Sequence, residues 1–194
     1  MLAAFCAGPP VAPSPPKEAA SDRAETYARL LEAEDRRTFD PALFGRAAAS
    51  PDPWLRSKAA LAAGRLRDPD ASALLPALLR DPDSSVRRSA AFAAGVSGEP
   101  RMVGVSVEAL SDPDSATAAF AAEALGKLGG PEATAVLLGA LGRPGPARPA
   151  AAKALFRTDD SKVVAALALV ALDAATPPDV HGAAIYALAR RPSR

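Results

Sequence analysis

Histidine, cysteine and aromatic side chains are scarce in this 194-residue sequence, which has one histidine, one cysteine and 5% aromatic residues. The single cysteine, Cys6, excludes an intramolecular disulfide and any cysteine-rich metal site. A Ser–His–Asp or Cys–His pair depends on His181 alone, and no metal-ligand spacing exists. The sequence therefore predicts no catalytic residue, no metal and no cofactor, and we expect a protein that is not an enzyme.

Excess charge of one sign and long apolar runs are also missing. Lys and Arg number 23 against 22 for Asp and Glu, so the net charge is +1. A surface that binds the phosphate backbone needs a strong positive field, so we expect no nucleic-acid partner. No apolar run reaches the length of about 18 residues that spans a membrane. Gly129-Gly130-Pro131 indicates a turn between helices, not a phosphate-binding loop.

Alanine and leucine supply most of the 49% hydrophobic residues, and both favour helix. No stretch alternates between apolar and polar residues with period two, so no strands are expected. The sequence therefore predicts an all-α fold.

Internal repeats organise the chain. Three segments align without gaps: PDPWLRSKAALAAG (51–64), PDSSVRRSAAFAAG (82–95) and PDSATAAFAAEALG (113–126). Each step is 31 residues, and a second series keeps it by closing on Leu79, Leu110, Leu141 and Leu172. First helices recur at 146–156, after a loop one residue shorter, and at 179–189. Each unit therefore predicts a hairpin of two helices.

A hairpin of this size buries its apolar face only by stacking on its neighbours. We therefore predict a right-handed α-solenoid of stacked helical hairpins, about 31 residues each. The Asp-Pro-Asp starts offer acidic N-caps at Asp81 and Asp112. Gly64, Gly95 and Gly126 are expected to relax helix packing or to permit a left-handed exit.

The expected organisation is a disordered, Pro-rich tether followed by one solenoid. Its parts are the tether (1–20), the solenoid (21–194), a diverged first unit (22–49), clear repeats (50–79, 80–110, 111–141, 142–172) and a partial last unit (173–194).

The second helices give the main functional prediction. We expect first helices to form the convex side and second helices the concave side, where repeat proteins usually bind partners. A series at steps of 31 residues lies beside buried positions and carries few charges, which suggests an apolar groove for a peptide, helix or partner domain. Its predicted residues are Ala73, Pro76, Val107, Glu108, Leu138 and Leu169. The alternative is that these residues belong to the core.

Arg56 and Arg87 recur at one repeat position, and Arg148 joins them across the shorter loop. A structural ladder is the favoured interpretation, with each arginine bonding an acid or loop carbonyl of an adjacent repeat. The alternative is an anion-binding or nucleic-acid-binding stripe, which Ala118 interrupts. Trp54, in a first turn, is expected to wedge against the preceding unit.

The pattern DPDxxVRxxAAxAAG followed by AxxLLxxL resembles the HEAT repeat, and more narrowly the HEAT-like repeats of phycobilisome lyases. The first unit, YARLLEAEDRRTFDPALFGRAAASPDPWLR, resembles bacterial envelope proteins that join HEAT repeats to a prolyl isomerase, although no isomerase domain is present. The resemblance implies fold much more than function. Iron-binding HEAT hydroxylases use several His–Glu pairs, which this sequence lacks.

A non-catalytic scaffold for a protein or peptide is the function expected from these features. The alternatives are a phycobilin-lyase-like accessory protein and a HEAT-type binder of DNA lesions. Cys6, followed by a Pro-rich linker, resembles the lipidated end of a bacterial lipoprotein, which makes it a candidate lipidation site. The expected location is therefore cytoplasmic, or periplasmic with the chain held to the membrane only by that anchor.

Overall fold

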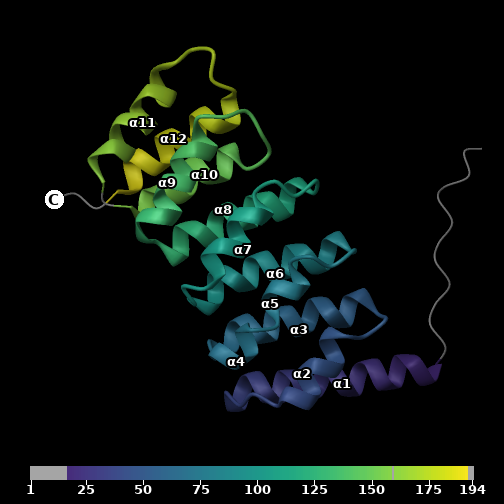
Figure 1. Ribbon diagram of the computed structural model, residues 1–194. Helices are drawn as coiled ribbons and strands as arrows, with labels where there is room; N and C mark the ends of the chain where they lie inside the picture. The colour runs from purple at the N-terminus through teal and green to yellow at the C-terminus, as the bar shows by residue number, and fades with distance from the viewer. Residues whose placement is uncertain (1–16, 159, 192–194) are drawn as a thin grey trace, which may run out of the picture.

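The computed structural model describes residues 17–158 and 160–191, and in this part of the chain every regular element is a helix (Figure 1). The elements, in order, are α1 (Lys17–Arg36), α2 (Pro41–Ala48), α3 (Pro53–Leu66), α4 (Pro69–Ser72), α5 (Leu75–Leu78), α6 (Ser84–Ser97), α7 (Met102–Ala109), α8 (Ser115–Leu128), α9 (Gly130–Leu141), α10 (Arg148–Ala154), the 3-10 helix η1 (Leu155–Arg157), α11 (Ser161–Leu172) and α12 (Pro178–Arg190).

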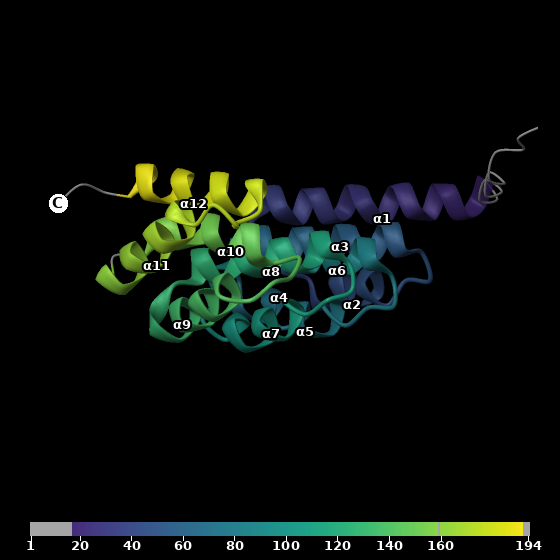
Figure 2. The same ribbon diagram turned by 90° about the horizontal axis from the view of Figure 1, so that it is seen from above.

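Successive hairpins stack into an α-solenoid, which confirms the predicted fold class. Figure 2 shows two layers of helices side by side. We call α1, α3, α6, α8, α10 and α12 the first-helix layer, and α2, α4, α5, α7, α9 and α11 the second-helix layer. No described helix combines the length and apolarity needed to cross a bilayer.

Helix α1 begins at Lys17, inside the segment 1–20 that was predicted to be a disordered tether. Lys, Glu and Ala are strong helix formers, so residues 17–20 extend the helix by about a turn. The remainder of the predicted tether, including Cys6, lies outside the described residues.

Aspartates cap the helices of the central repeats, one proline later than the sequence pattern suggested. The carboxylates of Asp52, Asp83 and Asp114 accept hydrogen bonds from the N–H groups of Trp54, Ser85 and Thr117 at 2.9, 2.8 and 2.8 Å. These bonds satisfy amide donors that have no partner inside the helix. The predicted caps Asp81 and Asp112 instead lie in the loops before the caps, where they bind arginines.

The recurring glycines allow adjacent first helices to approach closely. A Cβ atom built on Gly64 would lie 2.6 Å from the carbonyl oxygen of Ala93, and one on Gly95 would lie 2.7 Å from the Cα atom of Ala124. The alternative prediction, a left-handed exit at these glycines, is wrong. Left-handed backbone occurs a few residues later, and the residues concerned include Arg67, Gly98 and Gly129, with φ of 52°, 72° and 69°.

The repeat built from α10 and α11 is one residue shorter than its predecessors in both helices. Leu167 and Val163 of α11 are buried like Leu137 and Ala133 of α9, so the step here is 30 residues. The predicted 31-residue step to Leu172 is therefore wrong, and that side chain is 84% exposed. The shortened loop before α10 shifts the whole unit, because the second helix is fixed by packing on the first.

Candidate partner-binding face

The six predicted groove residues lie on the second-helix layer or at its helix ends, and none is fully buried. Pro76, Val107 and Leu138 are half-buried, whereas Ala73, Glu108 and Leu169 are exposed. The alternative that all of them belong to the core does not describe their burial. The series nevertheless divides into two regions of different chemistry.

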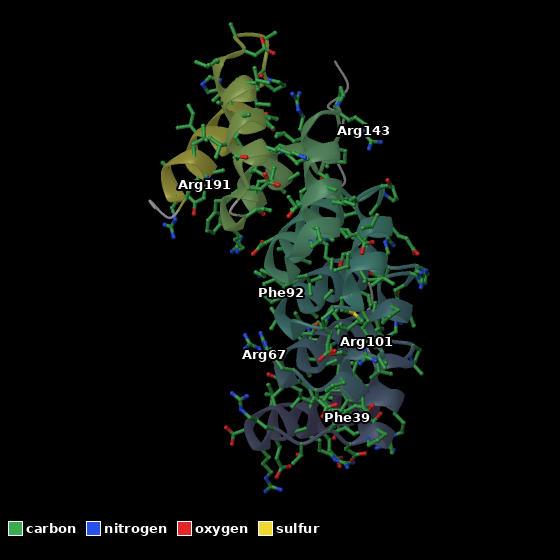
Figure 3. All side chains as sticks on the ribbon, turned by 60° about the vertical axis from the view of Figure 1, so that its left-hand side comes forward. Phe39, Arg67, Phe92, Arg101, Arg143 and Arg191 are labelled. Atoms are coloured by element: carbon green, nitrogen blue, oxygen red, sulfur yellow. The ribbon has the colours of Figure 1, made fainter. Side chains whose placement is uncertain are left out.

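The region over α5 and α7 is polar. Arg80 pairs with Glu108 at 2.5 Å across neighbouring repeats, and both side chains are more than half exposed. Arg101 donates a hydrogen bond to the carbonyl of Pro69, again across a repeat boundary. A cavity of about 240 Å³ lies beside the Arg80–Glu108 pair, with Leu79 and Val105 in its wall. Figure 3 shows Arg101 among these side chains and Phe92 toward the first helices.

The region over α11 is apolar. Leu169 and Leu172 are 72% and 84% exposed, and Val164 is 40% exposed. With the 30-residue step, Leu169 is equivalent to Glu108 and Gly139, not to Leu138 as the 31-residue step implied. Two leucines therefore occupy surface positions that carry polar residues or glycine in the preceding repeats, and sequence reasoning missed Leu172 because it was assigned to the core.

A hollow of about 550 Å³ lies where α9 meets the following repeat. Leu138 and Ala135 contribute its apolar wall, and Arg157 and Lys162 contribute positive charge. The structure therefore brings Leu138 to a concave site flanked by basic side chains, while Leu169 lies outside that lining.

The arginine ladder is confirmed. Arg87 donates two hydrogen bonds to the carboxylate of Asp112, at 2.7 and 3.0 Å, and its third nitrogen binds the carbonyls of Asp81 and Pro82. Arg56 makes the same contacts one repeat earlier with Asp81. Arg148, which has no acid at that position, donates to the carbonyl of Leu141 at 2.9 Å. Each arginine thus ties neighbouring repeats together through their loops.

The ladder shifts the pKa of its carboxyl groups. Burial opposes ionisation of Asp112, but the hydrogen bonds from Arg87 and from the Asp114 amide outweigh it, so the pKa of Asp112 lies below its usual value. The pKa of Asp81 is lowered by the same balance, with Arg56 as the donor. The ion pair also raises the pKa of Arg87, chiefly through the hydrogen bond to Asp112.

Acid should therefore weaken the stack. A carboxyl whose pKa is lower in the folded state stabilises the fold above its unfolded pKa of about 3.9, and this contribution is lost as the pH falls through the folded pKa. We expect the free energy of unfolding to drop below about pH 4, and we expect Asp112→Asn to reduce that slope by one carboxyl. Denaturant titrations at a series of pH values measure it, and equal slopes for the variant and the wild type contradict the expectation.

Trp54 packs against the preceding unit, as predicted: its ring meets that of Tyr27 edge to face, with centroids 5.0 Å apart. Arg23 stacks on the same indole at 4.0 Å. His181 is half-buried at the repeat position of Arg87. Among the described residues, no group of three or more metal-ligating side chains is placed to hold a metal ion.

Comparisons with known proteins agree with this architecture. A family model described as HEAT repeats matches residues 23–94, 71–155 and 107–189. No curated protein matches the chain. The crystal structure of an engineered protein has a similar fold, with 23% identity, a TM-score of 0.55 and coverage of 90% of this chain and 89% of that one. Human deoxyhypusine hydroxylase in complex with glycerol is 17% identical over 88% of this chain and 85% of that one, and its TM-score of 0.42 supports no argument.

Proposed function

The chain belongs to the HEAT-repeat family, and on that basis we propose that it is a non-catalytic scaffold that binds a protein or peptide on the α9–α11 part of its second-helix layer. Leu169 and Leu172 carry the proposal. They lie one helical turn apart on α11 and are 72% and 84% exposed. Neighbouring exposed apolar side chains on a repeat protein mark a contact surface rather than a core.

An amphipathic helix or short apolar segment suits this surface. Residues three and four apart on the partner helix meet a pair of leucines spaced by three residues. Leu138 and the hollow beside it offer a recess for one anchoring side chain, and such central anchors dominate binding energy. Arg157 and Lys162 border the recess, so acidic residues next to the partner's apolar face complement it.

The polar region over α5 and α7 supports a limit on the contact. Arg80 and Glu108 already satisfy each other across the repeat boundary. A partner that covered them would have to desolvate both charges, which costs free energy unless the pair is replaced by equally good bonds. The proposed contact therefore covers α9 and α11 and stops short of α7.

Selection from a displayed library of helical peptides tests this function. We expect the selected peptides to share an apolar face with acidic neighbours, and we expect Leu169→Asp to weaken their binding by about 1–3 kcal/mol, or tenfold or more. Fluorescence anisotropy with the selected peptides measures the affinity.

The matched control is Ala77→Asp, which places the same charge at the position equivalent to Leu169 in the second unit. It is exposed there, at the end of the stack away from α11. Peptides that bind both variants as tightly as the wild type would show that the contact lies elsewhere on the chain.

A further inference from the structure

One face of α12 exposes apolar side chains at the end of the first-helix layer. Ile185 and Tyr186 are 49% and 36% exposed, and Gly182 and Ala189 beside them are also exposed. In repeat register, Ile185 is equivalent to Ala91, Ala122 and Ala152, each of which is at most 1% exposed. The face of α12 is therefore the one that every internal first helix presents to the next repeat. We call its four residues the trailing strip.

The opposite end of the layer shows the complementary pattern. Ala24, Ala28 and Leu31 of α1 are exposed, with 42% exposure for Leu31. Their equivalents 62 residues later, Val86, Ala90 and Ala93, are at most 1% exposed because they pack against the preceding repeat. A hollow of about 330 Å³ borders these three residues and the Tyr27 and Trp54 rings. We call Ala24, Ala28 and Leu31 the leading strip.

We propose that the chain associates head to tail with copies of itself, the trailing strip of one copy packing on the leading strip of the next. The two strips are the two halves of one contact that already recurs inside the array, between α3 and α6 and between α6 and α8. Figure 1 shows α1 and α12 at opposite ends of the stack, so neither strip can reach the other within one chain.

The direction of the helices is compatible with this contact. First helices run parallel, because the Tyr27–Trp54 ring contact joins the early turns of α1 and α3 while the Glu34–Arg65 ion pair joins their last turns. In the same parallel alignment the last turn of α12 faces the last turn of α1 of the next copy. Arg190 there meets a turn that exposes the carboxylates of Glu32 and Asp35, so the charges are complementary.

Aromatic packing follows the same register. Inside the array, Phe92 meets Phe120 of the next first helix edge to face, with centroids 5.9 Å apart. The equivalent pair across the copies is Tyr186 with Tyr27. Leu31 and Ala189 replace the small alanine and glycine at the closest point, so the two helices are spaced more widely, as α10 and α12 are around Phe156. The two strips differ, so the contact is heterologous and the assembly grows as an open filament or closes as a ring.

Mixing two variants of the full chain tests the proposal. Ile185→Asp disables the trailing strip and Leu31→Asp disables the leading strip, and both side chains are exposed, so folding is retained and is checked by helical circular dichroism. Sedimentation velocity from about 1 µM to about 1 mM is expected to show the wild type growing beyond a dimer with concentration, each variant alone at least tenfold weaker, and the equimolar mixture forming a dimer that grows no further.

The control is Leu169→Asp, which removes an exposed leucine outside both strips and should assemble as the wild type does. This variant is expected to lose peptide binding and keep assembly, whereas Ile185→Asp keeps peptide binding and loses assembly. A wild type that stays monomeric over this range overturns the proposal, as does a dimer that survives Leu31→Asp, because a contact between two trailing strips would leave Leu31 unused.

Discussion

Gly64→Ala is expected to destabilise the stack by about 2–4 kcal/mol, although alanine is the better helix former. The new Cβ would lie 2.6 Å from the carbonyl oxygen and 2.7 Å from the Cα atom of Ala93. Both are backbone atoms, which cannot rotate away, so α3 and α6 must separate. Separation opens gaps along the whole interface between these two helices, and the loss exceeds the overlap of one methyl group. Denaturant titration followed by helical circular dichroism measures the change.

The same substitution at Gly104 is the matched control. Gly104 lies in α7, and a Cβ atom there has nothing within 4 Å. Helix propensity alone then acts, and Gly104→Ala should stabilise the protein by about 0.5–1 kcal/mol. The two substitutions are thus expected to have opposite signs. Stabilisation by Gly64→Ala would contradict the close approach of α3 and α6.

Arg87→Ala is expected to cost about 3 kcal/mol of stability, because it leaves the Asp112 carboxylate buried without its cation. The two side chains are 14% and 8% exposed, and the guanidinium also binds two loop carbonyls. The substitution therefore orphans acceptors in two neighbouring repeats. In a repeat array such a loss weakens one interface, so unfolding should begin at the boundary between α6 and α8. Urea titration gives the magnitude, and hydrogen exchange shows where opening begins.

Arg80→Ala is the control for this prediction, because Arg80 and Glu108 also join two repeats but are 57% and 62% exposed. An exposed pair contributes little, so the expected change is within about 0.5 kcal/mol. Combining Arg87→Ala with Asp112→Ala should cost less than the sum of the single variants, since the second change removes the orphaned charge. Equal losses for Arg80→Ala and Arg87→Ala would show that burial does not set the strength of the ladder.

Much of the fold follows from residues that repeat along the chain. The 31-residue step of Gly64, Gly95 and Gly126 predicted stacked hairpins, and the recurrence of Arg56 and Arg87 beside aspartates predicted the ladder. These features are readable because the same local chemistry must be rebuilt in every unit. The wedge role of Trp54 was predictable for a similar reason, since a large ring in a first turn has only the preceding unit to pack against.

The candidate face was less predictable because it depends on helical phase. A shift of one residue rotates a side chain by about 100° around a helix axis. The fourth clear repeat is one residue short, and a uniform step therefore placed Leu172 in the core and paired Leu169 with Leu138. The structure puts both leucines of α11 on the surface. The predicted caps at Asp81 and Asp112 failed similarly, one turn of the loop away from the residues that cap the helices.

The sequence by itself determined that this protein is a helical array with a fixed step, acidic helix starts and an arginine at each of several equivalent positions, because those properties are carried by residue types at fixed spacing. Only the tertiary structure decided which surfaces remain open. Ala24 and Val86 occupy equivalent positions, yet one is exposed and the other buried, because burial depends on whether a neighbouring repeat is present. The binding face on α11 and the two end strips are therefore consequences of packing, not of local pattern.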